Sequence, residues 1–401
     1  MHRLRATAQR LLLLTVSLAA SLWAADLAFV WYEQRYLIPR LPVKGEASPV
    51  DLAGLNYNSD VVEREEAPGT FRILSFGDSF AYSIMQPRLS YAGVLERLLN
   101  EDPGDRRFRV VNLGEPATTT PHYLAAYRFW SEVLQHDAAL FHVYLGNDLL
   151  DVAYQYAPRE WEANRVFIGM DRSIVDGRSR RVPHRYPLRM LDYAYALWLV
   201  GESAPVVEAP SPDHNTAARS NLPVEKWRQT LFIQMDNFDP ALLGRLEPGY
   251  VEIVKLFELA GRLHANGVHV AVALGPNEAQ VRPAVLEETL EAHGATRDRY
   301  DLDLSRCIIE AIAREVAPDV RVIDLTPALR AQHARTGAPL YYRRNTHWDR
   351  EGNELVAEVI AEAVRSAWLG EGAARAPRSP CDGDFESVVH AVLDARRADS
   401  R

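Results

Sequence analysis

The stretch RILSFGDSFAYS, residues 72–83, runs from strand-forming residues directly into a Gly-Asp-Ser turn. β-Branched and aromatic residues favour strands, whereas glycine and aspartate favour turns. Two interpretations follow. Either Ser79 is a nucleophile held at the tip of a strand, or it is an ordinary turn residue that caps the helix expected near Tyr91 or earlier. The pattern around this stretch has to decide between them.

Four further apolar runs repeat the same sequence of strand, turn and helix. These four runs lie at 108–114, 139–146, 267–275 and 320–325, and the first run, which overlaps the quoted stretch, lies at 71–77. Their nearly continuous hydrophobicity predicts strands covered on both faces, as in a parallel sheet. Helical periodicity fills the intervals, for example at 91–101 and at 252–267, where Gly267 ends the pattern. Alternating strands and helices predict an α/β fold, a three-layer α/β/α sandwich with right-handed crossovers.

One interval breaks this repeat. Between residues 151 and 249 we find a basic patch at 178–185, an apolar helical pattern at 188–201 and a linker-like run at 204–223. An insertion of this length after a central strand is either a lid or substrate-binding subdomain, or a packing appendage. We therefore expect a catalytic domain at 70–369 with 151–249 inserted in it. A tail at 370–401 follows, with a short helix at 385–397.

The first 36 residues form a separate segment. Arg3, Arg5 and Arg10 precede an apolar run at 11–32, which as a helix would span about 33 Å, enough to cross a bilayer. Its one charge, Asp26, lies near the far end. The basic end predicts a single-pass anchor in the inner (plasma) membrane, with the rest on the extracytoplasmic, periplasmic side. A signal peptide cleaved near 19–21 and a buried soluble helix are the alternatives.

Composition narrows the function classes. Hydrophobic residues make up 47% and charged residues 25%, which is typical of a folded protein, and the net charge of −9 argues against a nucleic-acid partner. Cys307 and Cys381 make neither a disulfide framework nor a metal site. They could form one bridge, but the polar tail around Cys381 argues against it. The histidines show no metal-ligand spacing, so we expect no metal and no cofactor.

Chemically useful groups follow three of the predicted strands. Asp78 and Ser79 follow the first, Gly114 the second and Asn147 the third. Ligands of open α/β sheets bind beyond the carboxyl ends of the strands, so these groups should converge on one crevice. His347, just before a helix expected from about residue 350, would reach the same crevice from a loop.

The residue types suit acyl-ester chemistry. Ser79 is a weak nucleophile until a base such as His347 takes its proton. The Ser79 N–H, the Gly114 N–H and the Asn147 amide would form an oxyanion hole. Asp78 is interpreted as structural support of the turn and not as the triad acid. His142, in the middle of a strand, and Trp348 are interpreted as core residues.

In order, these blocks resemble the SGNH (GDSL-type) hydrolase superfamily. The resemblance rests on GDS at 77–79, Gly114 of NLG, GND at 146–148 and the histidine of NTHWDREGN. VALGPNEAQVRP and DLTPALR, followed by YY and HW, further resemble the branch near alginate O-acetyltransferase-like proteins. The resemblance implies a flavodoxin-like fold and serine-dependent hydrolysis or transfer of acyl groups, often acetyl groups on carbohydrates.

The sequence departs from this family at the triad acid. The family places an aspartate two or three residues before its histidine, where this chain has Asn345 and Arg344. In serine proteases that replacement costs about 10⁴ in kcat. Asn345 is the best-placed residue to orient the histidine. Asp349, Glu351 and Asp324 are possible substitutes for the acid.

These features predict a serine acyl-ester hydrolase that acts on O-acyl groups of a carbohydrate through an acyl-serine intermediate. An O-acyltransferase to a glycan hydroxyl would use the same residues. A non-catalytic carbohydrate-binding protein is the third alternative. Aromatic side chains of the insertion suit either sugar stacking or core filling: Tyr154, Tyr156, Trp161, Trp198 and Trp227. The sequence does not identify any protein partner.

Overall fold

The structure is a computed structural model that describes most of the chain. The described residues are 2–32, 48–53, 57–101, 106–116, 118–155, 165–168, 172–175, 178–180, 188, 190–191, 221–368, 381 and 385–399. The chain divides into two compact units. One comprises Met1–Leu41 with Phe167–Glu208, the other Pro42–Val166 with Ala209–Arg401. The second unit contains the central sheet and every candidate site residue.

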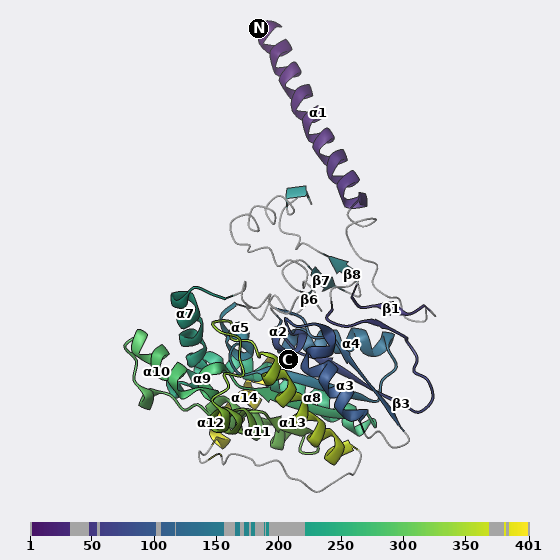
Figure 1. Ribbon diagram of the computed structural model, residues 1–401. Helices are drawn as coiled ribbons and strands as arrows, with labels where there is room; N and C mark the ends of the chain where they lie inside the picture. Colours follow the sequence, from purple (N-terminus) through teal and green to yellow (C-terminus); the bar gives the residue numbers. More distant parts are fainter. Residues whose placement is uncertain are drawn as a thin grey trace. The chain divides into compact units, whose positions relative to one another are not determined.

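The central sheet has five parallel strands (Figure 1). They are β3 (Thr70–Phe76), β4 (Arg107–Asn112), β5 (Ala138–Tyr144), β9 (His269–Gly275) and β10 (Arg321–Asp324). Each coincides with one of the five predicted strands, within two residues at either end. The predicted parallel α/β sandwich is therefore confirmed.

The strand order places a crevice beside the Gly-Asp-Ser turn. The order β10-β9-β5-β3-β4 puts the first strand of the sheet, β3, between the second, β4, and the third, β5. The chain therefore reverses its direction of winding at β3, and ligands of doubly wound sheets bind at that switch point. The carboxyl end of β3 leads directly into residues 77–79.

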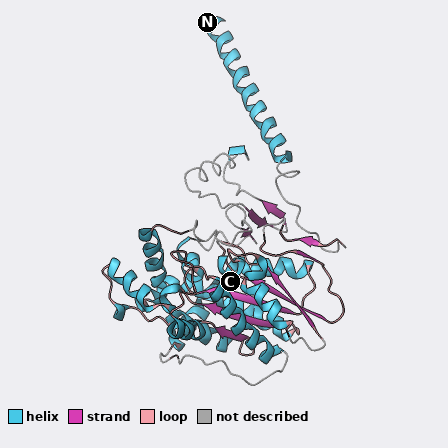
Figure 2. Ribbon diagram, viewed as in Figure 1, coloured by secondary structure: helices cyan, strands magenta, loops and turns pink. Residues whose placement is uncertain are grey.

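Helices cover both faces of this sheet (Figure 2). On one face α3 (Tyr91–Leu99) packs against α13 (Arg350–Trp368). On the other face α8 (Leu243–Ala265) packs against α4 (Thr120–Val133) and α11 (Leu304–Val316). These two helical layers and the sheet make the three layers of the sandwich.

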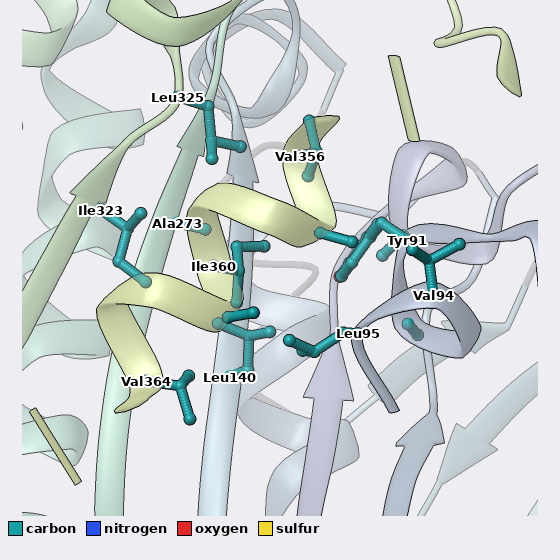
Figure 3. Packing of buried hydrophobic residues seen from close by; sticks show 14 of the residues in the cluster. Tyr91, Val94, Leu95, Leu140, Ala273, Ile323, Leu325, Val356, Ile360 and Val364 are labelled. Atoms are coloured by element: carbon teal, nitrogen blue, oxygen red, sulfur yellow. The ribbon is translucent and has the colours of Figure 1, made fainter. Parts of the chain in front are cut away.

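The helix α13 illustrates how the sequence pattern determines packing. Val356, Ile360 and Val364 recur every four residues, so they form one face of the helix, and each is at most 1% exposed. Figure 3 shows this face lying over the sheet, where Leu140 of β5 and Ile323 of β10 meet it. Burying each such side chain contributes about 1.5–3 kcal/mol relative to exposure. This packing fixes α13, which begins three residues after His347.

The remaining elements of the second unit are short or peripheral. Strands β1 (Val50–Asp51) and β2 (Val61–Val62) pair antiparallel. The other helices are α2 (Ser79–Tyr82), η2 (Pro87–Leu89), α5 (Asp148–Gln155), α7 (Val224–Gln234), η5 (Met235–Phe238), η6 (Pro240–Leu242), α9 (Glu278–Val281), α10 (Pro283–Ala292), η7 (Arg297–Arg299), α12 (Thr326–Thr336) and α14 (Glu386–Asp399). The last of these confirms the short helix predicted in the tail.

The predicted insertion is described only in part. Strands β6 (Arg165–Ile168), β7 (Arg172–Val175) and β8 (Arg178–Arg180) form a three-stranded sheet, and α8 already begins within the interval, at Leu243. The predicted helix at 188–201 and the linker-like run lie largely outside the described residues. The domain boundaries and the role of the insertion as a lid stay predictions.

The N-terminal segment forms α1 (His2–Tyr32). Within the described part of the chain, it is the one helix long and apolar enough to cross a membrane, over Leu13–Trp31 with a mean hydropathy of 1.8. A signal sequence near an N-terminus has the same features. Within the same unit, Asp26 Oδ1 accepts a hydrogen bond from the Met190 N–H at 2.8 Å.

The two cysteines form a disulfide, contrary to the expectation from sequence. Cys307 lies on α11 and bonds Cys381, with 5.6 Å between their Cα atoms. The polar composition around Cys381 was misleading, because α14, which follows this cysteine, packs against α8 and α11. That contact returns the tail to the helical layer that carries Cys307.

Candidate active site

The turn after β3 places Ser79 at the start of a helix without using it as a cap. Asp78 is the N-cap of α2, and its Oδ1 accepts a hydrogen bond from the Phe80 N–H at 2.9 Å. The helix that begins at Tyr91 is capped by Ser90. The interpretation of Ser79 as a helix cap is therefore wrong. Its hydroxyl remains available at the switch point of the sheet.

The structure brings Ser79, His347 and Asn345 together. Ser79 Oγ lies 2.8 Å from His347 Nε2, although 268 residues separate them in the chain. His347 Nδ1 lies 2.7 Å from Asn345 Oδ1 and 2.9 Å from the main-chain oxygen of Asn345. These are hydrogen-bond distances, and the arrangement is the one expected if Ser79 is a nucleophile, His347 its base and Asn345 the residue that orients the base.

The main-chain oxygen of Asn345 can perform one task of the missing aspartate, which is to fix the tautomer of His347. An asparagine side chain can donate as well as accept, which is how it can select the wrong tautomer of a histidine. A carbonyl oxygen can only accept, so it requires a proton on His347 Nδ1 and leaves Nε2 free to accept the Ser79 proton. Arg344 and Thr346, on either side, have φ angles of 56° and 60°, a left-handed backbone that non-glycine residues rarely adopt.

The environment keeps His347 in its neutral form. Burial lowers the pKa of His347 below its usual value, while the charge of Asp78 and the bond to Asn345 partly offset this effect. The ring of Phe80 stacks on the imidazole with 4.8 Å between the ring centroids. A neutral imidazole at physiological pH is the form that a general base requires.

A buried asparagine that the sequence did not single out holds the histidine loop. Asn353 of α13 is 1% exposed and accepts a hydrogen bond from the Tyr91 N–H at 3.0 Å. Its amide donates to the main-chain oxygens of Trp348 at 3.1 Å and Asp349 at 2.9 Å. Asn353 therefore ties the N-terminus of α3 to the loop that carries His347. The one sequence signal was an asparagine inside a helix, where it is unfavourable without such a role.

Gly114 lies beside the nucleophile turn, and its N–H is engaged within the chain. It donates to Asn112 Oδ1 at 3.0 Å, and the Asn112 amide donates to the Ala81 oxygen at 2.8 Å. Asn112 thereby ties the end of β4 to α2, a link the sequence analysis missed. A role for the Gly114 N–H as an oxyanion donor stays a prediction.

Asn147 is one of the residues that line a cavity. Its amide donates to Asp151 Oδ2 at 3.0 Å. Burial raises the pKa of Asp151 to about 6, although the bond from Asn147 counteracts part of that shift. A cavity of about 460 Å³ is lined by Asn147 and Asp151 together with α7 and α8 residues that include Ile233 and Arg245. The oxyanion role of Asn147 also stays a prediction.

His142 and Trp348 are buried, as the core interpretation predicted. His142 is fully buried, and its Nδ1 lies 3.8 Å from Asp78 Oδ1. Trp348 is 2% exposed, and its ring meets that of Phe80 edge-on at 5.0 Å.

None of the three substitute acids considered from sequence has a hydrogen bond to His347 in the described residues. Asp349 Oδ1 accepts the Gly352 N–H at 2.9 Å and thereby caps α13. Asp324 Oδ1 accepts the Thr326 N–H at 2.9 Å. Glu351 is exposed. Within the described residues, none of these three acids therefore takes the place of the missing aspartate by bonding to His347.

The aromatic residues of the insertion give no sugar platform in the described structure. Trp227 is 5% exposed and donates from Nε1 to Glu278 at 3.3 Å, so it fills the core. The side chains of Tyr154, Tyr156, Trp161 and Trp198 lie outside the described part. Across the described ranges, no cluster of three or more His, Cys, Asp or Glu side chains could hold a metal ion.

Comparison with known proteins agrees with this geometry. Residues 252–385 match the family model described as ALGX, the SGNH hydrolase-like domain of the acetyltransferase AlgX. The chain resembles AlgX and the SGNH hydrolases. The matched residues contain β9, β10 and the His347 loop, whereas Ser79, Gly114 and Asn147 lie before them. No match is found among the curated proteins.

Solved structures show only remote likeness. The acetyl xylan esterase AlAXEase is 12% identical with a TM-score of 0.37, over 73% of this chain and 100% of that chain. A mutant of Axe2, an acetyl-xylooligosaccharide esterase from a Geobacillus species, is 12% identical with a TM-score of 0.39, over 74% and 94% of the two chains. TesA is 10% identical with a TM-score of 0.35, over 74% and 99%. At these values the likeness adds nothing about activity.

Proposed function

We propose that this chain is a serine acyl-ester enzyme that acts on O-acyl groups, chiefly acetyl groups, of a carbohydrate. The observation that carries the proposal is the contact of 2.8 Å between Ser79 Oγ and His347 Nε2, with Nδ1 held by the two oxygens of Asn345. A hydroxyl bonded to an imidazole whose tautomer is fixed is the minimum arrangement for nucleophilic catalysis by serine.

The reaction would proceed in two stages. Ser79 Oγ attacks the acyl carbonyl carbon while its proton passes to His347 Nε2. The tetrahedral intermediate then collapses, the bond to the alcohol oxygen breaks, and His347 returns the proton to that oxygen. Water or a sugar hydroxyl next attacks the acyl-Ser79 ester and gives its own proton to His347 Nε2. The bond between the acyl carbon and Ser79 Oγ then breaks, His347 returns the proton to Ser79 Oγ, and the acyl group leaves as an acid or as a new ester.

The oxyanion would need donors at the mouth of the crevice. The Asn147 amide suits this role, since it can donate without carrying charge, and Asp151 orients it at 3.0 Å. The Gly114 N–H would join it only after leaving Asn112. Replacement of Asn147 by alanine should lower kcat by about 10²–10³.

Transfer to a glycan is the second candidate, because the matching family model is described as an acetyltransferase. Hydrolysis and transfer share the acyl-Ser79 intermediate and differ in the acceptor. The detergent-solubilised full chain would be given p-nitrophenyl acetate with and without an oligosaccharide acceptor. Release of p-nitrophenol follows the first stage, and mass spectrometry of the oligosaccharide follows transfer.

We expect the parent chain to release p-nitrophenol and Ser79→Ala to release none above background. Acetylated oligosaccharide would identify a transferase, and free acetate alone an esterase. Equal rates in the parent and in Ser79→Ala would contradict both and leave a carbohydrate-binding protein with a degenerate site.

We further propose that α1 anchors the enzyme in the inner membrane with its catalytic domain on the extracytoplasmic side. The basic residues before the apolar run favour this orientation. The Cys307–Cys381 disulfide supports an oxidising compartment. The intact mass of the protein recovered from the membrane fraction would test this, since a cleaved signal peptide would remove roughly the first 20 residues.

A further inference from the structure

The two hydrogen-bond acceptors of His347 Nδ1 are both neutral. They are the side-chain and main-chain oxygens of Asn345. When Ser79 gives up its proton, the imidazole becomes a buried cation, and a buried cation is costly without a nearby negative charge. In the usual triad one carboxylate fixes the tautomer and also stabilises the imidazolium. Asn345 performs the first task only.

Asp148 of α5 is a buried acid that is already engaged by other groups. Asp148 is fully buried and accepts hydrogen bonds from the Tyr123 hydroxyl at 2.9 Å and from the Tyr144 N–H at 2.9 Å. Burial, together with the charge of Asp78, raises the pKa of Asp148 well above its usual value. The Asp148 carboxyl is therefore harder to ionise than a free carboxyl, and its oxygens already serve other donors.

Asp78 is a carboxylate placed next to the nucleophile. It is 1% exposed, and its Oδ1 accepts the Phe80 N–H. Its Oδ2 has no hydrogen bond to any described residue. The residues on its C-terminal side both touch the base, Ser79 through its hydroxyl and Phe80 through its stacked ring. A charge so far from water acts at a low effective dielectric constant and is felt over several ångströms.

We propose that Asp78 supplies the negative charge that stabilises the His347 imidazolium, the part of the triad acid's work that Asn345 cannot do. The proposal rests on the proposed serine chemistry. Because Asp78 would act through His347 and touch no reacting atom, it is a positioning residue. The work of one triad aspartate would thus be divided between Asn345 for the tautomer and Asp78 for the charge.

Other groups near Asp78 must be separated from this effect. On β5, His142 Nδ1 lies 3.8 Å from Asp78 Oδ1, and neither of its ring nitrogens has a hydrogen bond among the described residues. Burial, and to a smaller extent the charge of Asp78, raises the pKa of groups on α3, α4, β5 and α5: Tyr91, Tyr123, Tyr144, Asp148 and Asp151. The raised pKa values favour the neutral form of the three tyrosines and of Asp148. Asp151 alone of these five has a pKa of about 6.

The test is a pH titration of the full chain, labelled with ¹⁵N-histidine, in detergent. NMR of the ring nitrogens gives the pKa of His347, assigned with His347→Gln. Asp78→Asn keeps an oxygen to accept the Phe80 N–H and removes the charge. We expect it to lower the His347 pKa by about one unit, since an opposite charge nearby typically contributes about 1–3 units.

The same change should appear in reactivity. The acid limb of fluorophosphonate labelling, where the rate falls as His347 is protonated, should move to lower pH by the same amount. The maximal rate should fall about 10-fold, because the imidazolium formed in the transition state loses the same stabilisation. Asn345→Asp in the Asp78→Asn background should return both the pKa and the rate toward the parent values. Asp151→Asn is the matched control and should leave the His347 pKa where it is.

A His347 pKa unchanged in folded Asp78→Asn would overturn the proposal, as would a loss of rate without movement of the acid limb. Should Asp78→Asn not fold, Asp78→Ser offers a second neutral N-cap with the same expectation. The titration needs no turnover. An unlabelled parent would contradict the proposed function, while the NMR shift would still decide the role of Asp78.

Discussion

Single residues decide whether the nucleophile turn can form. Gly114 lies so close to α2 that a Cβ atom there would be 2.5 Å from the Tyr82 nitrogen and 2.6 Å from the Ala81 Cβ. The glycine in the NLG block is therefore required by the close approach of β4 to α2, whether or not its N–H binds an oxyanion. The position of this glycine was predictable from sequence, but its close approach to α2 was not.

Gly114→Ala should therefore displace the turn that carries Ser79. We expect a loss of about 1–3 kcal/mol in the free energy of unfolding, since overpacking costs that much. Activity should fall by about 100-fold, because a shift of roughly 1 Å in a catalytic group can cost that factor. Denaturant unfolding and fluorophosphonate labelling measure the two effects. The matched control is Gly244→Ala in α8, where the new Cβ has no neighbouring atom within 4 Å outside the local helix backbone. It should lower neither the free energy of unfolding nor the rate of labelling. A Gly114→Ala protein as stable and reactive as the control would contradict this account.

At the scale of elements, the strands were predictable and their connections less so. All five strands were visible as apolar runs because both faces of a parallel sheet are buried. The roles of buried polar residues such as Asn112 and Asn353 were not predicted, because these side chains bond to main-chain groups that are far away in the sequence. The disulfide was not predicted because its cysteines are 74 residues apart and the polar composition around Cys381 argued against it. The proximity of Ser79 and His347 was predictable because each follows or precedes a regular element at the edge of the sheet where such groups meet.

The helix α4 carries a pH-sensitive N-terminus. His122, 1% exposed, accepts the Thr119 N–H at 2.9 Å through Nδ1, and burial lowers its pKa to about 3. The unfolded chain binds a proton at this residue below about pH 6.5, whereas the folded chain does not. The contribution of His122 to the free energy of unfolding should therefore be fully present above about pH 6.5 and be lost progressively as the pH falls toward 3. At pH 5 the loss from this residue is about 2 kcal/mol.

His122→Gln tests this assignment, since glutamine at the third helical position can make the same capping bond without titrating. Urea unfolding of the full chain at pH 7 and pH 5 gives the two free energies. The difference between them should be smaller in His122→Gln than in the parent by about 2 kcal/mol. Other titrating groups contribute equally to both proteins. An identical pH dependence in the two proteins would refute the role of His122.

At the scale of the molecule, the disulfide joins segments 74 residues apart. A cross-link over a loop of this length stabilises the folded state by about 2–4 kcal/mol, mainly by restricting the unfolded chain. Cys381→Ser should lower the Tm measured by circular dichroism under non-reducing conditions. Reductant should lower the Tm of the parent toward that of the variant and leave the variant unchanged. A parent Tm insensitive to reductant would contradict this expectation.

The central claim, that Asn345 sustains an activated serine in place of the usual aspartate, is tested most directly by covalent labelling. A fluorophosphonate probe would be added to the full chain in detergent, with Ser79→Ala and His347→Ala alongside and circular dichroism as the check of folding. We predict labelling of the parent alone, mapped by mass spectrometry to the peptide that contains Ser79. A folded parent that takes no label, or a Ser79→Ala protein that still does, would contradict the claim.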